Sequence, residues 1–150
     1  QLALQAAETD MTIFYRLLGN CERKELESNP SHGLEVVQDA FYEPDQLSGE
    51  VRQQWQAWFL AYGRRLGATA MADDIRRRQM NSINPKYVLR NYMAQLAIDA
   101  AEEGDNALIE ELHRLLTAPY EEQPESERWF AKRPDWARHK VGCSMLSCSS

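Results

Sequence analysis

The chain has 150 residues, of which 43% are apolar and 27% charged, which is enough for one domain to bury a core. Its 23 acidic residues outnumber the 17 basic ones, and the net charge of −6 argues against non-specific binding to a nucleic acid duplex. No apolar run approaches the ~20 residues of a membrane span, and no secretory signal opens the chain. We therefore expect neither nucleic acid nor a membrane as a partner.

The ends and the cysteines suggest the setting of the chain. The first residue is Gln1 rather than Met, and the residues that follow have the composition of a helix interior. We therefore expect the chain to begin within a longer protein. Three cysteines, two of them close to the C-terminus, do not make a disulfide framework, so a reduced, cytoplasmic setting is expected.

Helical periodicity dominates from the start of the chain. An amphipathic helix is expected over residues 11–18, with Asp10 as its cap and Gly19 near its end. A polar stretch follows. A short helix then carries apolar residues over 34–41, and Pro44 stops it.

The clearest amphipathic segment runs from about residue 48 to residue 66, where large apolar residues recur at spacings of three and four. They are Val51, Trp55, Trp58, Phe59, Tyr62 and Leu66. Gly67 stands where a helix-ending glycine is expected. The aromatic stripe would also suit a ligand that stacks on it, but helical spacing favours a core.

A further helix is expected over about residues 69–80. Asp73 and Asp74 come early in it and three arginines, residues 76–78, come late, an order that suits the helix dipole. We interpret the arginines as an exposed basic helix end. The alternative is a site for a phosphate or an acidic partner.

The next helix is expected to start with Asn84 as cap and Pro85 in the first turn, and to end at Gly104. Its expected stripe is Val88, Leu89, Tyr92, Met93, Leu96, Ala97 and Ala100. Arg90 and Asn91 would then lie in mid-helix, where Asn has a propensity cost unless its amide is used. We interpret this pair as a structural contact to polypeptide outside the chain.

Asp105 or Asn106 caps a last helix, which Pro119 ends. The residues expected to face inward are Leu108, Ile109, Leu112, Leu115 and Leu116. No segment has convincing strand alternation. The prediction is an all-α, bundle-like subdomain of about six helices within residues 1–117.

From residue 118 to residue 150 the character changes. Three prolines and many charges predict an irregular tail, which the large aromatics Trp129, Phe130 and Trp136 anchor against a folded body. Among the last residues, Cys148 lies close enough to the end to be accessible for thiol–disulfide exchange, with Cys143 as the second choice. An idle terminal thiol is the alternative.

Motifs for catalysis and for cofactors do not stand out in the sequence. The three histidines fall on different predicted elements, and no spacing of ligands suggests zinc or calcium. A glycine-rich phosphate loop and a nucleophile elbow are also absent. We therefore expect no catalytic residue, no cofactor site and no metal site within this chain.

Residues 84–92, Asn-Pro-Lys-Tyr-Val-Leu-Arg-Asn-Tyr, together with Gln95, resemble the signature of the selenoprotein O family, the YdiU-type bacterial proteins. Residues 8–15, the aromatic helix around Trp55 and the ending Cys148-Ser-Ser are similar in kind and order. The resemblance covers most of the chain and implies the C-terminal third of such a protein.

The resemblance implies a protein-kinase-like fold that binds ATP in an inverted pose with Mg²⁺ or Mn²⁺. The implied activity of the full-length protein is transfer of AMP to Ser, Thr or Tyr hydroxyls of protein substrates, or of UMP in a second version. The catalytic, nucleotide-binding and metal-binding residues belong upstream, so this chain alone is expected to be inactive. Its partner is then the N-terminal kinase-like region.

One functional position transfers by resemblance. Cys148 occupies the place of the family's selenocysteine or cysteine, which implies a regulatory disulfide with a cysteine of the kinase-like domain. Cys143 departs from the Cys-x-x-Cys arrangement of some members, because four residues separate it from Cys148. A long-range disulfide is therefore the better hypothesis.

Two other functions stay open. The first is a free-standing helical interaction module, without catalytic activity, whose apolar groove binds a partner peptide. The second is a small thiol oxidoreductase, which we rank last because nothing basic in the last ten residues would lower a thiol pKa.

Overall fold

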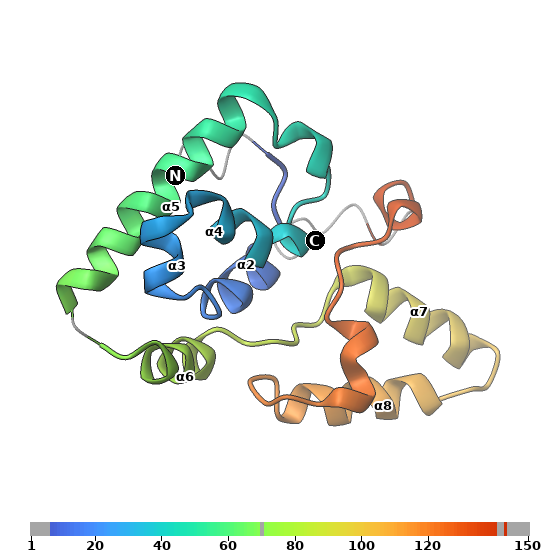
Figure 1. Cartoon of the computed structure of the whole chain (residues 1–150). Coiled ribbons are helices and arrows are strands. Elements are labelled where there is room, and N and C mark those ends of the chain that lie inside the picture. The colour runs from blue at the N-terminus through green and yellow to red at the C-terminus, as the bar shows by residue number, and fades with distance from the viewer. Residues whose placement is uncertain (1–6, 70, 141–142, 144–150) are drawn as a thin grey trace. The chain divides into compact units, whose positions relative to one another are not determined.

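The computed structural model of the chain describes residues 7–69, 71–140 and 143 (Figure 1). Within them the regular secondary structure is helical, and the pairing of extended backbone is limited to one isolated bridge between Thr9 and Phe41. The prediction of an all-α fold is therefore confirmed. By packing, the chain divides into two units, residues 1–84 and residues 85–150.

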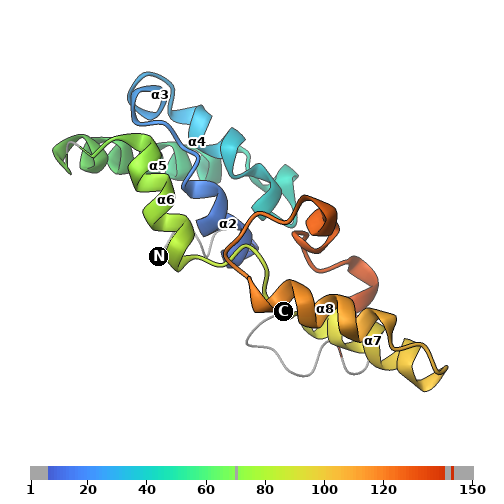
Figure 2. The same ribbon diagram turned by 90° about the horizontal axis from the view of Figure 1, so that it is seen from below.

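Unit 1 consists of short helices and one long helix. Its elements are α2 (Met11–Leu18), α3 (Arg23–Ser28), α4 (Pro30–Val36), η1 (Gln38–Ala40), η2 (Pro44–Gln46), α5 (Gly49–Thr69) and α6 (Asp73–Ile83). The short helices α3 and α4 pack against α5, as Figures 1 and 2 show.

Helix α2 forms where the sequence predicts it. The Asp10 carboxylate accepts a hydrogen bond from the Ile13 amide at 3.1 Å, so it satisfies one of the free N–H groups of the first turn. Ile13 and Phe14 are buried, and Asp10 itself is only 5% exposed. The cap and the helix over residues 11–18 are confirmed.

Aromatic rings fill the core of unit 1. Trp55 and Phe59 of α5 are fully buried, and the Trp55 ring lies 5.2 Å from Phe41 and 5.5 Å from Phe14, centroid to centroid. Trp58 stacks on Tyr62 at 5.3 Å, and both side chains are half-buried. The interpretation of this stripe as core is thus confirmed for its inner members.

The polar stretch after α2 contains helix α3, which the sequence did not predict. Leu26 alone is buried in it, so the sequence shows no repeating apolar pattern there. Two expectations for unit 1 are wrong. The short helix α4 begins at Pro30 and ends at Val36, so Phe41 lies outside it, in extended backbone. Gly67 does not end α5, because the helix continues to Thr69.

The arginine run of α6 is also different from the expectation. Arg76 is only 6% exposed, donates to the Cys21 carbonyl and forms an ion pair with Asp73 at 3.0 Å. The exposed basic end that we expected therefore does not include this residue. Arg77 and Arg78 are exposed.

Unit 2 is built on two helices and a chain segment that packs across them. Its elements are α7 (Asn91–Glu102), α8 (Ala107–Thr117), η3 (Pro124–Trp129) and η4 (Asp135–Arg138). Helices α7 and α8 lie side by side (Figures 1 and 2). The turn between them uses Gly104 at φ +90. Asn106 is the N-cap residue of α8, and the Asp105 carboxylate before it accepts a hydrogen bond from the Ala107 amide at 2.9 Å.

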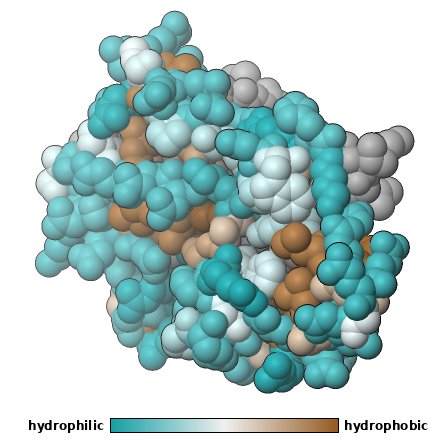
Figure 3. Space-filling model, turned by 90° about the vertical axis from the view of Figure 1, so that its right-hand side faces the viewer, coloured by the Kyte–Doolittle hydropathy of each residue, from teal (hydrophilic) through white to brown (hydrophobic). Residues whose placement is uncertain are grey.

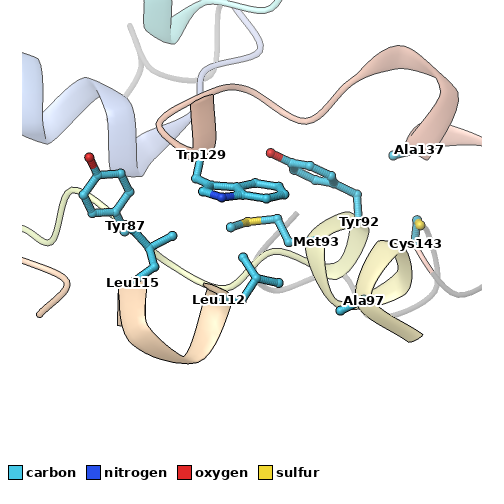
Figure 4. Packing of buried hydrophobic residues seen from close by; sticks show 9 residues of the cluster. All are labelled: Tyr87, Tyr92, Met93, Ala97, Leu112, Leu115, Trp129, Ala137 and Cys143. Atoms are coloured by element: carbon cyan, nitrogen blue, oxygen red, sulfur yellow. The ribbon is translucent and has the colours of Figure 1, made fainter. Parts of the chain in front are cut away.

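The tail contributes to the core of unit 2. Trp129, Ala137 and Cys143 are buried together with side chains of α7 and α8 (Figure 4). Trp136 is 44% exposed but meets Tyr92 edge-on, with ring centroids 6.2 Å apart. The boundary expected at residue 118 stays a prediction. By packing, residues 118–140 belong to the same unit as the last two helices.

In the described part of the chain, no helix combines the length and the apolar character that crossing a membrane would require.

Candidate functional site

Most of the sequence motif that carries the family resemblance, residues 84–90, lies outside any helix, and only its last two residues belong to α7. Helix α6 ends at Ile83, and Asn84 adopts φ −108 and ψ 105, as a residue before proline prefers. The Asn84 backbone amide and side-chain amide both donate to the Met80 carbonyl, at 2.9 and 2.8 Å, so Asn84 closes α6 instead of opening the next helix. The helix expected from residue 84 begins only at Asn91.

Arg90 and Asn91 therefore do not lie in mid-helix. Arg90 is the N-cap residue of α7, with φ −102 and ψ 151, and Asn91 is the first residue of the helix. The propensity argument for the pair does not apply at a helix start. Arg90 is buried at 5% exposure, and its carbonyl accepts from the Met93 and Ala94 amides at 3.0 and 3.1 Å. A contact of this pair with polypeptide outside the chain stays a prediction.

The centre of the segment is a buried lysine. The Lys86 side chain is 8% exposed, and its Nζ donates to the carboxylates of Glu122 and Glu127, both at 2.6 Å. Nζ also lies 5.5 Å from the Tyr87 ring centroid and 5.2 Å from that of Phe130. Burial acts to lower the pKa of Lys86, but the two carboxylate hydrogen bonds outweigh it and hold this pKa above its ordinary value.

Backbone hydrogen bonds tie the same segment to the chain after α8. The Lys86 and Tyr87 amides both donate to the Pro119 carbonyl, at 2.8 and 3.1 Å. The Tyr87 hydroxyl donates to the Gln123 carbonyl at 3.1 Å, and burial raises the pKa of this phenol. The Gln123 side-chain amide donates to the Leu115 carbonyl at 3.1 Å, near the end of α8. We call the group of Lys86, Tyr87, Pro119, Glu122, Gln123 and Glu127 the Lys86 clamp.

A second ion pair holds η3 on α8. The Glu111 carboxylate accepts from Arg128 at 2.5 and 2.6 Å and from the Trp129 indole N–H at 2.8 Å. These hydrogen bonds, that from Arg128 foremost, hold the pKa of Glu111 below its ordinary value. Both groups of contacts fix the position of backbone, which is a structural task.

Neither the Lys86 clamp nor its burial was expected from the sequence. Glu122 and Glu127 follow the lysine by 36 and 41 residues, a separation that corresponds to no helical or strand spacing. Of the predicted site residues, the structure brings Pro85, Arg90 and Asn91 into unit 2, beside the clamp in sequence. It leaves Asn84 at the end of α6.

The described thiols are buried. Cys143 is 1% exposed in the core of unit 2, and Cys21 is fully buried in unit 1. Burial raises the pKa of Cys21 to about 12, with Arg76 acting in the opposite direction. Cys148 lies outside the described residues, so its role stays a prediction. Among the described residues, no three His, Cys, Asp or Glu side chains form a group that could hold a metal ion.

An apolar groove in unit 2 is lined by residues of α7, of α8 and of the segment before α7. It has a volume of about 290 Å³, and its lining includes Leu89, Ile98, Ile109, Leu112, His113 and Leu116. Leu89, Ile98 and Ile109 are 48%, 50% and 46% exposed, although we expected Leu89 and Ile109 to face inward. These two expectations are wrong. Leu89 precedes α7, so it is not part of a helical stripe, and the buried face of α8 contains Leu112 and Leu115 but leaves Ile109 half exposed. We call this feature the α7–α8 groove.

Comparison with known proteins identifies the class to which this helical region belongs. The chain is 54% identical over 150 residues to the protein nucleotidyltransferase YdiU of Flavobacterium johnsoniae, and the match covers 100% of this chain and 28% of that protein. It is 49% identical to the protein of the same name in Rhodopirellula baltica, over 98% of this chain and 28% of that protein. For that of Aromatoleum aromaticum the identity is 48%, over 98% and 27%. No family model matches the chain.

The chain spans only about 28% of the length of the curated relatives it matches, so it corresponds to one helical region of these larger proteins. The chain belongs to the selenoprotein O family of YdiU-type proteins, as residues 84–92 predicted.

Proposed function

We propose that the chain is the C-terminal region of a protein nucleotidyltransferase, which transfers AMP from ATP to Ser, Thr or Tyr hydroxyls of other proteins. The observation that supports this proposal is the 54% identity, over the whole chain, to a protein named as a nucleotidyltransferase. Transfer of UMP from UTP is the variant of the same chemistry. The proposed location is the cytoplasm.

The proposal assigns catalysis to polypeptide outside these 150 residues. ATP, Mg²⁺ or Mn²⁺ and the catalytic acid would be held by a kinase-like region, where positioning and charge neutralisation lower the barrier to phosphoryl chemistry. In this chain, the charged side chains of the Lys86 clamp are engaged with one another. The region would therefore act as a buttress for the catalytic part.

The second role that we propose is redox regulation through Cys148. Its thiol and a thiol of the kinase-like region would form one disulfide, while a small-molecule disulfide takes up the two electrons and two protons. The burial of Cys21 and Cys143 supports the choice, since buried thiols exchange slowly.

The test uses the full-length protein and ATP labelled at the α-phosphate. We expect label to enter acceptor proteins, and the rate to change when the buffer is shifted from reduced to oxidised glutathione. Cys148→Ser should abolish this change, and the control Cys143→Ala, which removes a buried thiol, should keep it. Absence of labelling under every condition would refute the transferase, and an unchanged redox response in Cys148→Ser would refute the regulatory role.

A helical interaction module is the second candidate, and the α7–α8 groove is the observation that favours it. It predicts that the chain, in the absence of any further polypeptide, captures a peptide with apolar anchors. In that case the 150-residue chain would bind its partner as tightly as the full-length protein does.

A further inference from the structure

We infer that the α7–α8 groove is a docking site for another part of the same polypeptide, one that lies outside these 150 residues. The inference rests on one part of the proposed function, namely that the chain is a region of a longer protein. It adds where on this region the remaining polypeptide binds and with what kind of side chain.

The groove combines exposure with apolar character. Leu89 comes from the non-helical segment before α7, Ile98 from α7 and Ile109 from α8, and each of these residues is about half exposed. A single exposed aliphatic residue is ordinary, but three around one hollow indicate a binding surface. The face of the molecule in Figure 3 is mostly hydrophilic, with apolar side chains in separate patches.

The shape of the groove selects apolar side chains as its occupant. Its volume of about 290 Å³ lies at or below the lower end of the ~300–1,000 Å³ that cofactor and drug sites occupy. The ionisable residue of its lining is His113, so a charged segment would lose its hydration there without gaining a partner of opposite sign. A helix or loop that presents a few Leu, Ile, Val or Phe side chains fits best.

The size of the patch argues for a tethered occupant. Three half-exposed aliphatic side chains present a patch of the order of a few hundred Å², the size of the largest patch on a typical monomer. A stable dimer or a separate partner needs ~800 Å² on each side. A segment of the same polypeptide needs far less, because tethering gives it an effective concentration in the mM range.

The length of the family's proteins supplies the candidate. The chain covers 28% of the Flavobacterium relative, so nearly three quarters of such a protein lies outside the sequence described here. A second copy of the chain would offer only another patch of the same limited area. The polypeptide outside the chain is therefore the occupant that we infer.

The test is photocross-linking in the full-length protein. A benzophenone amino acid replaces Ile109 in one variant and Leu89 in a second, and Glu110, the exposed neighbour on α8, in the control. We expect cross-linked peptides that join either groove position to polypeptide outside residues 1–150, at the mass of a monomer and several-fold more abundant than in the control.

Three results would overturn the inference: cross-links at the mass of a dimer, cross-links confined to residues 1–150, or a yield no higher than that of the Glu110 variant. The measurement needs no activity. If the expected cross-links form in a protein that transfers no nucleotide, the transferase is refuted and the docking site is supported. If the protein transfers nucleotide but the cross-links are missing, the docking site alone is refuted.

Discussion

Replacing Lys86 by methionine tests whether the Lys86 clamp holds unit 2 together. Methionine keeps most of the length of the side chain, and with it the packing against Tyr87 and Phe130, but it removes the ammonium group. The two hydrogen bonds of 2.6 Å to Glu122 and Glu127 are then lost.

The magnitude follows from how the partners are exposed. A hydrogen bond to a charged group contributes about 1.5–3 kcal/mol when buried, whereas an exposed ion pair contributes about 0–1 kcal/mol. The lysine side chain is 8% exposed, but the side chains of Glu122 and Glu127 are 63% and 57% exposed. The contribution of each hydrogen bond to stability therefore lies between these limits. We expect Lys86→Met to destabilise unit 2 by about 1–3 kcal/mol.

Removing the carboxylates is the complementary change. In the double variant Glu122→Gln, Glu127→Gln the ammonium stays buried without an opposite charge, so the loss should equal or exceed that of Lys86→Met. The assay is native-state hydrogen exchange of the α7 and α8 amides, which reports unit 2 separately from unit 1.

The control is Arg78→Met. Arg78 forms an ion pair of 2.9 Å with Asp74, but the two side chains are 74% and 58% exposed, so its loss should change stability by less than about 0.5 kcal/mol. If the α7 and α8 amides are as well protected from hydrogen exchange in Lys86→Met as in Arg78→Met, the Lys86 clamp contributes no stability and the reasoning from its burial is wrong.

Three further predictions concern packing, thiol reactivity and pH. Gly33→Ala should destabilise unit 1 by about 3 kcal/mol or more in urea unfolding, since the added Cβ would lie 2.2 Å from a carbon of the buried Phe59 ring. Cys21 should escape alkylation by iodoacetamide at pH 8 in the folded chain and react in urea, because it is fully buried and its pKa is about 12. Stability should fall as the pH drops below 4.5, the ordinary value for Glu111, because the pKa of this group is lowered in the fold and the Arg128 hydrogen bond is lost on protonation.

Each of these predictions has its own control. Gly67→Ala should be tolerated, because its Cβ would meet the end of the flexible Glu27 side chain at 3.2 Å, and an unfolding midpoint that falls as far as that of Gly33→Ala would contradict the packing argument. Rapid alkylation of native Cys21 would show that the thiol is accessible. For the acid transition, Glu111→Gln should shrink the loss of stability, and an unchanged pH profile would assign the transition to other carboxylates.

The parts of the fold that could be predicted are those in which local signals agree. Helix α2 has a capping Asp10 and a regular apolar face, and α5 has a wide aromatic stripe, so both were expected at nearly their observed positions. Helix α3 could not be found in this way, because a six-residue helix that buries only Leu26 shows no period.

The segment around the family motif misled sequence reasoning for a physical reason. Asn-Pro is a good helix start, and Val88, Leu89 and Tyr92 have a helical spacing, so local chemistry favoured a helix from residue 84. Tertiary contacts override it: the Lys86 and Tyr87 amides are hydrogen-bonded to the Pro119 carbonyl, far along the chain. Such partners cannot be derived from local sequence.

The same holds for the candidate site. The motif containing Arg90 and Asn91 could be singled out as unusual, but the acidic partners of Lys86 come from a tail whose path is set by packing. The burial of Arg76 was hidden for a similar reason, because its acceptor is the Cys21 carbonyl, 55 residues away.

Titration of ATP with Mg²⁺ or Mn²⁺ into the 150-residue chain, followed by calorimetry, tests most directly whether nucleotide binding belongs to polypeptide outside this chain. With circular dichroism as a check that the chain is helical, we expect no saturable heat up to millimolar nucleotide, while the full-length protein binds. Saturable binding of ATP by the 150-residue chain alone would place the nucleotide site within this chain and contradict the account.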